Sequence, residues 1–127
     1  CIRDRGAICA TKAAIKEGIV AGGGIALLNA STAVTPKDKS EEVLLKAIQA
    51  PFKTILKNAG IETYDMPKVK GKGLDVVTGN MVSMIKSGIV DPLLVTKSAL
   101  RNAASVATTI LSTDCVINNL RIDESNR

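Results

Sequence analysis

Histidine is missing from this chain of 127 residues, and tryptophan is missing as well. Without histidine, the chain cannot supply a Ser–His–Asp triad, a Cys–His catalytic pair or a histidine ligand to a metal ion. The three cysteines, Cys1, Cys9 and Cys115, form no Cys-x-x-Cys spacing, so a structural zinc site is not expected. A sparse, odd cysteine count is typical of a reducing compartment. Any chemistry therefore depends on carboxylates, lysines, backbone amides and a bound ion.

Aromatic side chains and long apolar runs are also scarce. Phe52 and Tyr64 are the only aromatic residues, although 46% of the chain is hydrophobic. The core must therefore be aliphatic and rich in alanine, which favours closely packed helices over a β-sandwich. The longest nearly apolar run, residues 19–28, is about half of what a membrane span requires. Because the chain begins with Cys1 and has no signal-peptide pattern, we expect it to be an internal part of a longer protein.

Positive charges exceed negative charges by five, and the one dense basic cluster is Lys68, Lys70 and Lys72. Such a cluster can bind phosphate groups, so a small basic helical module that binds nucleic acid is one hypothesis for the chain. The cluster has no interleaved aromatic residues and no recognition-helix pattern. A solvated surface turn is the simpler interpretation.

The spacing of apolar residues predicts a mostly α protein. Pro51 is expected to kink or split the third helix, and Gly60 to end it. Between Gly60 and Gly79 only a short hairpin is expected. The predicted helices span residues 2–17, 24–31, 40–59, 79–87 and 92–112; the predicted hairpin strands span 66–69 and 74–77, a last strand spans 115–122, and a polar tail spans 123–127.

Three consecutive glycines, Gly22 to Gly24, separate the first two predicted helices. Each costs roughly 0.5–1 kcal/mol relative to alanine inside a helix, so the step needs a structural or functional reason. One reason is a sharp turn at a tight helix crossing. The other is a polar ligand that approaches the backbone and the free N–H groups of a helix start. The glycines alone do not decide between the two.

A second distinctive block runs from Gly88 to Ala107 and contains Asp91 followed by Pro92. Aspartate at the N-cap and proline at the first helical position are a strong signal for a helix start. Together with the block Glu17–Leu28, this segment resembles the C-terminal part of the equatorial domain of GroEL-type (group I) chaperonins. The resemblance covers about Gly6 to Val116, nearly the whole chain. It implies a mostly α equatorial-domain fragment, over residues 1–127, with a short hairpin and a C-terminal strand.

In the family that the chain resembles, the equatorial domain binds ATP and is built from both ends of the polypeptide. The resemblance implies that this chain supplies the nucleoside side of the ATP site. Gly23 would approach the ribose, Asp91 would accept hydrogen bonds from the ribose hydroxyls, and Ile89 would contact the adenine face. The segment Asp75, Val76 and Val77 would meet the adenine edge.

Each of these residues also has an ordinary structural interpretation. Gly23 could be a packing glycine, Ile89 a core residue, Asp91 a helix cap and Asp75 a solvated charge. The stretch between Gly60 and Gly73 is shorter than is usual in the family, so the alignment near Asp75 could shift by one residue.

The chain departs from the family pattern at Gly6. Glycine stands where the family has an aspartate that positions the attacking water during ATP hydrolysis, and Asp4 would lie about 200° away around a helix. We therefore assign no catalytic residue. A chaperonin relative that binds ATP without hydrolysing it is a third hypothesis.

The resemblance implies a parent protein that folds unfolded polypeptides at the expense of ATP. Identical subunits would form a ring and work with a co-chaperonin, without nucleic acid or membrane as partners. The phosphate-binding loop, the ligands of Mg²⁺ and the client-binding domain are expected outside this sequence, so the chain alone is expected to be inactive. The expected location is the bacterial cytoplasm or, alternatively, a mitochondrial or plastid matrix.

Overall fold

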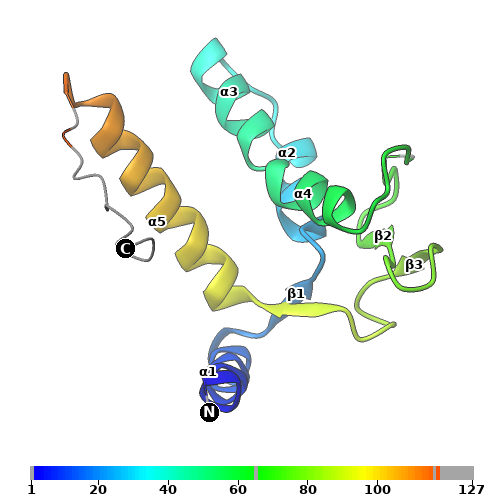
Figure 1. Ribbon diagram of the computed structural model, residues 1–127. Coiled ribbons are helices and arrows are strands. Elements are labelled where there is room, and N and C mark those ends of the chain that lie inside the picture. Colours follow the sequence, from blue (N-terminus) through cyan, green and yellow to red (C-terminus); the bar gives the residue numbers. More distant parts are fainter. Residues whose placement is uncertain (1, 65, 116, 118–127) are drawn as a thin grey trace, which may run out of the picture.

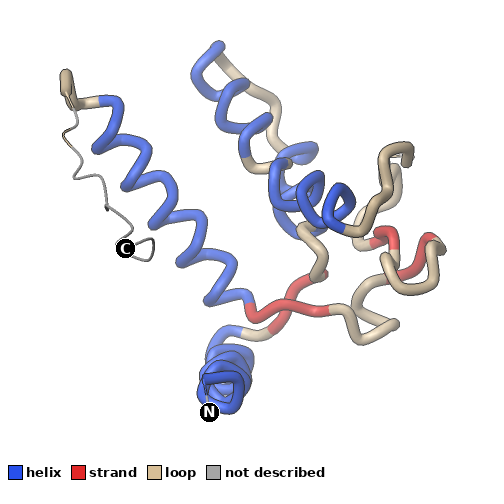
Figure 2. Tube along the Cα trace, viewed as in Figure 1, coloured by secondary structure: helices blue, strands red, loops and turns tan. Residues whose placement is uncertain are grey.

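The computed structural model describes residues 2–64, 66–115 and 117, and it is mostly α-helical (Figures 1 and 2). Two antiparallel pairs of short strands, β1 with β4 and β2 with β3, connect the helices. The elements in chain order are α1 (Ile2–Glu17), β1 (Ile19–Ala21), α2 (Ile25–Ala33), α3 (Lys39–Ala47), α4 (Ala50–Asn58), β2 (Lys72–Leu74), β3 (Met81–Ser83), β4 (Val90–Pro92) and α5 (Leu93–Leu111).

The β1–β4 pair lies at the centre of the molecule (Figure 1). Helix α1 precedes β1 and helix α5 follows β4, so both helices leave from this pair. Helices α2, α3 and α4 lie on another side, and the β2–β3 hairpin lies beside them (Figure 2). Segments about 70 residues apart in the chain therefore meet at β1 and β4.

The predicted split of the third helix is confirmed. Helix α3 ends at Ala47 and α4 begins at Ala50, with Pro51 in its first turn, where the missing N–H of proline has no cost. Gly60 ends α4 with φ +73°. The amide of Gly60 donates to the carbonyl of Lys57 (3.0 Å), and that of Ile61 donates to the carbonyl of Leu56 (3.0 Å). These are the two bonds of a Schellman motif, which glycine at this position favours.

The predicted helix at residues 79–87 is wrong. Residues Met81–Ser83 form strand β3, which pairs with Lys72–Leu74, and residues 84–88 form turns. The hairpin strands therefore lie several residues C-terminal to the predicted ranges, 66–69 and 74–77. The predicted strand at 115–122 falls mostly outside the described residues; Cys115 and Ile117 are described and belong to no strand.

The core is small and lies between α2, α4 and the β2–β3 hairpin. Its buried residues are Ala21, Ile25, Leu28, Phe52, Leu56 and Met84. The Phe52 and Tyr64 rings meet edge to face, with their centroids 5.5 Å apart. Such a pair adds about 0.5–1.5 kcal/mol to the contribution of buried area. Both aromatic residues of the chain thus stabilise one cluster.

Helix α5 has no fully buried residue, although it is the longest helix. An apolar groove of about 350 Å³ lies between α5 and α3. It is lined by Ala99, Ala103 and Ala107 of α5, by Leu44 of α3 and by Ile48 in the turn after α3. Val106 and Ile110 are exposed near the end of α5. Among the described residues, no helix combines the length and the apolar character needed to cross a membrane.

Candidate functional site

The β1–β4 pair brings the glycine step beside the Gly88–Ala107 block. In the antiparallel register, Val20 lies opposite Asp91 and Ala21 lies opposite Val90. The contact continues beyond the strands, because the amide of Gly22 donates to the carbonyl of Ile89 (2.9 Å). A Cβ on Gly22 would lie 3.1 Å from this same carbonyl oxygen, so the close approach favours glycine. Gly23, Ile89 and Asp91 therefore lie within one small region of the fold.

Asp91 is an exposed residue of β4, and the prediction that it caps α5 is wrong. The N-cap residue is Pro92, and no side chain caps the helix. The first helical amide, that of Leu93, donates instead to the carbonyl of Gly18 (3.0 Å). Asp91 lines a cavity of about 300 Å³ together with Ala21, Gly24 and Thr96. Among the described residues, no hydrogen bond or ion pair engages its carboxylate, so the acceptor sites are available to a ligand.

Gly23 has a structural explanation in the described residues. Its φ is +65°, and a Cβ built there would lie 2.8 Å from the terminal methyl of Met84. Positive φ and close contact both favour glycine. The turn that Gly23 belongs to is closed by a bond from the amide of Ile25 to the carbonyl of Gly22 (3.1 Å). The predicted turn at the glycine step is thus confirmed, and a ligand is not required to explain it.

Ile89 is half-buried and packs against the core cluster. Its amide donates to the carbonyl of Met84 (2.9 Å), and its carbonyl accepts from Gly22. The residue therefore joins the β1–β4 pair to the β2–β3 hairpin. Its side chain contributes to the core, in agreement with the structural interpretation of this residue.

Asp75, Val76 and Val77 lie in the loop that connects β2 to β3, outside the cavity that Asp91 lines. The Asp75 carboxylate accepts hydrogen bonds from the amide of Val77 (2.9 Å) and from the hydroxyl of Thr78 (2.9 Å). Val77 is 88% exposed. Asp75 is therefore not a free solvated charge. Its partner Thr78 was not among the predicted site residues.

The two hydrogen bonds lower the pKa of Asp75 from its ordinary value of 3.8, with the Val77 amide as the larger cause. Because the folded state favours the ionised form, the contribution of Asp75 to loop order is present above that ordinary value and is lost as the pH falls through the lowered pKa.

We expect protection of the Val77 amide against hydrogen exchange, corrected for the intrinsic rate, to fall in this acid range. The Asp75→Asn variant should lose this pH dependence. The Glu42 carboxyl, whose pKa is lowered by its bond to Lys46, is remote in sequence, and Glu42→Gln should leave the dependence unchanged.

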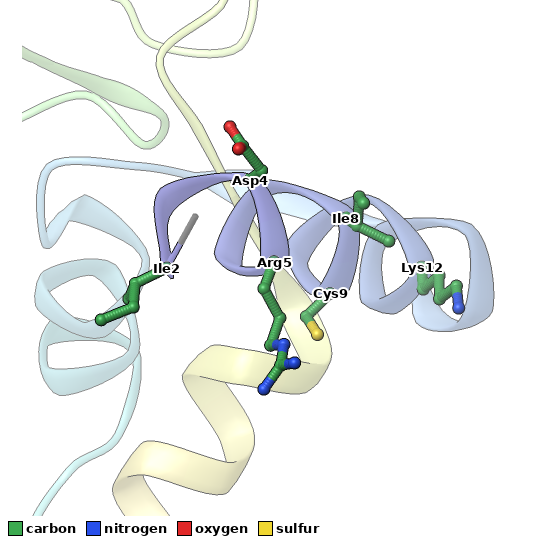
Figure 3. A pocket seen from close by; sticks show the side chains of 6 residues that line it. All are labelled: Ile2, Asp4, Arg5, Ile8, Cys9 and Lys12. Atoms are coloured by element: carbon green, nitrogen blue, oxygen red, sulfur yellow. The ribbon is translucent and has the colours of Figure 1, made fainter.

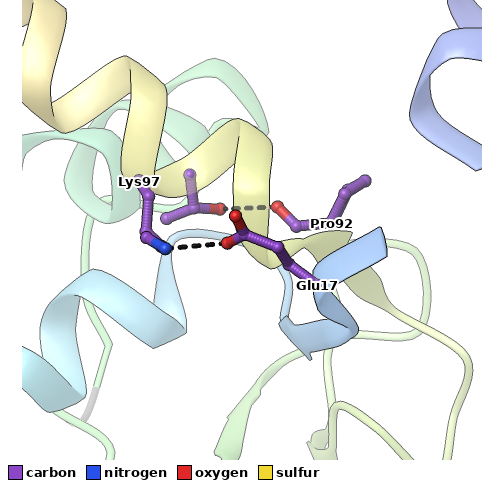
Figure 4. Close-up of polar contacts among 4 residues, drawn as sticks. Glu17, Pro92 and Lys97 are labelled. Atoms are coloured by element: carbon purple, nitrogen blue, oxygen red, sulfur yellow. Dashed lines mark hydrogen bonds and ion pairs between the residues drawn. The ribbon is translucent and has the colours of Figure 1, made fainter. Parts of the chain in front are cut away.

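A polar contact ties α1 to α5 next to this region (Figure 4). The ammonium group of Lys97 lies 2.7 Å from a carboxylate oxygen of Glu17, which is the last residue of α1. Thr96, one residue earlier, donates a long hydrogen bond to the carbonyl of Pro92 (3.4 Å). No local pattern predicts the Glu17–Lys97 pair, because its partners are 80 residues apart.

Gly6 lies on the exposed surface of α1, where a Cβ would meet no atom within 4 Å. A hollow on this helix is lined by Asp4, Arg5, Cys9 and Lys12, together with two isoleucines. Figure 3 shows Arg5 and Cys9 on one side of the helix and Asp4 on another. A larger side chain would therefore fit at position 6 without a clash.

The described part of the chain holds no candidate metal site, and its basic cluster is exposed on the surface. No group of three or more acidic or cysteine side chains is placed to hold a metal ion among these residues. Lys68, Lys70 and Lys72 are exposed, and Lys72 belongs to β2 while the other two precede it in a loop.

Comparison with known proteins identifies the family. A sequence profile of the TCP-1/cpn60 chaperonin family matches residues 3–121. The chain belongs to this family. The crystal structure of a group III chaperonin in the open state is similar to the chain, with a TM-score of 0.67 and 30% sequence identity. That match covers 83% of this chain and 25% of the chaperonin chain, so the sequence spans about a quarter of the length of this relative.

Family membership confirms that the sequence is a chaperonin sequence, and the structural similarity confirms a mostly α fold of the equatorial-domain type. These matches do not assign the chain to group I, the GroEL-type chaperonins. The similar structure is a group III chaperonin.

Proposed function

We propose that this chaperonin chain is the C-terminal part of the equatorial domain of a GroEL-type subunit, and that it supplies the nucleoside side of an ATP site. The observation that carries the proposal is the β1–β4 register, which sets Asp91 beside the glycine step. The carboxylate of Asp91 does not cap helix α5. An exposed acceptor next to a close-packed backbone turn suits the paired hydroxyls of a ribose. The two blocks that carry the resemblance to group I, residues 17–28 and 88–107, contain these groups.

The donor set of this chain suits a nucleoside better than a phosphate or a metal. Asp91 would accept from hydroxyl groups, the glycine step would allow close approach to the backbone, and Ile89 would offer an apolar edge. The ATP phosphates and Mg²⁺ would then be held by groups outside this sequence. When bound, ATP would supply the free energy that biases the domain between two states.

We also propose that the whole protein is an ATP-driven folding chaperone. Identical subunits would assemble as a ring, with a co-chaperonin and unfolded polypeptides as partners, in the bacterial cytoplasm or in a mitochondrial or plastid matrix. The apolar surface of α5 supports assembly with further protein, because an exposed apolar helix face favours a protein contact.

The Asp91→Ala substitution in the full-length protein tests the site. Loss of one acceptor is expected to weaken ATP binding by roughly 1–3 kcal/mol, or about 5- to 150-fold in Kd. Because no cap is lost, the thermal stability of the protein should stay within about 0.5 kcal/mol of the parent. Isothermal titration with ATP and a thermal unfolding curve measure the two quantities.

The Asp114→Ala variant is a suitable control, because Asp114 is also exposed and lies beyond α5. It should alter neither quantity. Unchanged ATP affinity in Asp91→Ala would contradict the proposed site. A loss of stability without a loss of affinity would show that Asp91 acts only on the fold.

A further inference from the structure

The cavity that Asp91 lines has a second polar side chain, that of Thr96 in the second turn of α5. Every other described residue that lines this cavity of about 300 Å³ is glycine, proline or aliphatic. Small-molecule sites in proteins commonly combine apolar walls with a few placed polar groups. In this cavity, Asp91 and Thr96 are the two side chains that can select for polar groups of a ligand.

The hydroxyl of Thr96 is held only weakly by its own helix. It donates to the carbonyl of Pro92 over 3.4 Å, which is longer than the roughly 2.5–3.0 Å of ordinary O–H···O hydrogen bonds. The other threonines of α5, Thr108 and Thr109, make the same bond to the carbonyl four residues earlier over 2.8 and 2.9 Å. Thr96 is half-buried, whereas the other two are exposed. The Thr96 hydroxyl can therefore turn from Pro92 to a ligand with little loss.

The two polar groups of the cavity differ in chemistry. An ionised carboxylate accepts hydrogen bonds only, whereas a hydroxyl both donates and accepts. Ribose presents two neighbouring hydroxyls, each of which also donates and accepts. A carboxylate and a hydroxyl in one cavity can thus each engage one hydroxyl of the same sugar.

We infer that Thr96 is a specificity-determining residue for the sugar: its hydroxyl bonds one ribose hydroxyl of the nucleotide, and Asp91 accepts from the other. This inference rests on the proposed function. It goes beyond the resemblance, which assigns the ribose to Gly23 and Asp91 and gives Thr96 no role. Selectivity for ribose over deoxyribose is then divided between two side chains, and the part due to Thr96 is lost with its hydroxyl.

The experiment measures the affinity of the full-length protein for ATP, 2′-deoxy-ATP and 3′-deoxy-ATP in the parent, Thr96→Val and Thr96→Ser. Thr96→Val keeps the shape of the side chain and removes the hydroxyl. We expect it to weaken ATP binding by about two- to tenfold, the order of one hydrogen bond. It should weaken binding of one deoxynucleotide by the same factor and leave the other unchanged, because the latter lacks the hydroxyl that Thr96 binds. Thr96→Ser keeps the hydroxyl and should retain most of the affinity.

The matched control is Thr108→Val. It removes a hydroxyl from the same helix, where the intrahelical bond is shorter and the side chain is exposed. All three affinities should stay at the parent values. Thermal unfolding compares the two valine variants. Even if Thr96→Val is the less stable, the three nucleotides still decide, because a folding defect lowers all three affinities by one factor.

Two results would overturn the inference and leave the proposed function in place. An equal loss for all three nucleotides in Thr96→Val would show that Thr96 supports the cavity without touching the sugar. Parent affinities for all three in that variant would show that the hydroxyl does not reach the ligand. If the parent protein binds none of the nucleotides, the proposed function fails and this inference fails with it.

Discussion

Replacing Gly24 with alanine is expected to destabilise the α2–α4 region strongly, by about 2–5 kcal/mol. Gly24 has φ +76°, a conformation in which a Cβ is strained. The new Cβ would also lie 2.7 Å from the backbone nitrogen of Phe52 and 2.8 Å from its Cα. Because backbone atoms of α4 cannot move aside as a flexible side chain would, the helices must separate. Hydrogen exchange of amides in α2 and α4, in the full-length protein, measures the loss.

The Gly88→Ala variant separates backbone strain from the clash. Gly88 has nearly the same φ, +74°, but a Cβ there would meet nothing within 4 Å. It should cost only the strain of the left-handed conformation, roughly 1–2 kcal/mol. If the two variants are equally stable, contact between α2 and α4 is not as close as the structure indicates.

The ends of the helices could be predicted from the sequence where one nearby residue determines them. The split at Pro51 and the end at Gly60 depend on the chemistry of one residue each, and both are present in the structure. The wrong helix at 79–87 has a different origin. Met81, Val82 and Ile85 fit a helical spacing, but the amide of Met84 donates to the carbonyl of Gly71 (3.1 Å), and this non-local pairing decides the conformation.

The candidate site was predictable in its members and not in its geometry. Family resemblance placed Gly23 and Asp91 in one site, while β1 and β4, which bring them together, are three residues each. Strands this short leave little alternation to detect, although Ile19-Val20 and Ile89-Val90 carry β-branched side chains. The cap prediction failed because Asp91 pairs in β4 and the carbonyl of Gly18 accepts from Leu93 instead.

Restoring a carboxylate at position 6 is expected to have the largest effect on activity. If Gly6 occupies the position of the hydrolytic aspartate, the full-length protein binds ATP and hydrolyses it slowly. Gly6→Asp should then raise steady-state phosphate release by about 10²-fold or more, the order expected for one group that positions or deprotonates water. The exposed surface of α1 leaves room for the side chain, so the substitution should not cost stability. Because glycine is a poor helix former, α1 should become slightly more stable.

Gly6→Ala and Gly6→Asn are the controls that isolate the carboxylate. Both remove the flexibility of glycine from α1, and asparagine also matches the size of aspartate, but neither carries a negative charge. Phosphate release should stay near the parent rate in both variants. A gain in Gly6→Ala equal to that in Gly6→Asp would show that stiffening α1, rather than supplying a carboxylate, limits turnover. No gain in Gly6→Asp, with ATP affinity intact, would show that position 6 is not the hydrolytic position of this chaperonin.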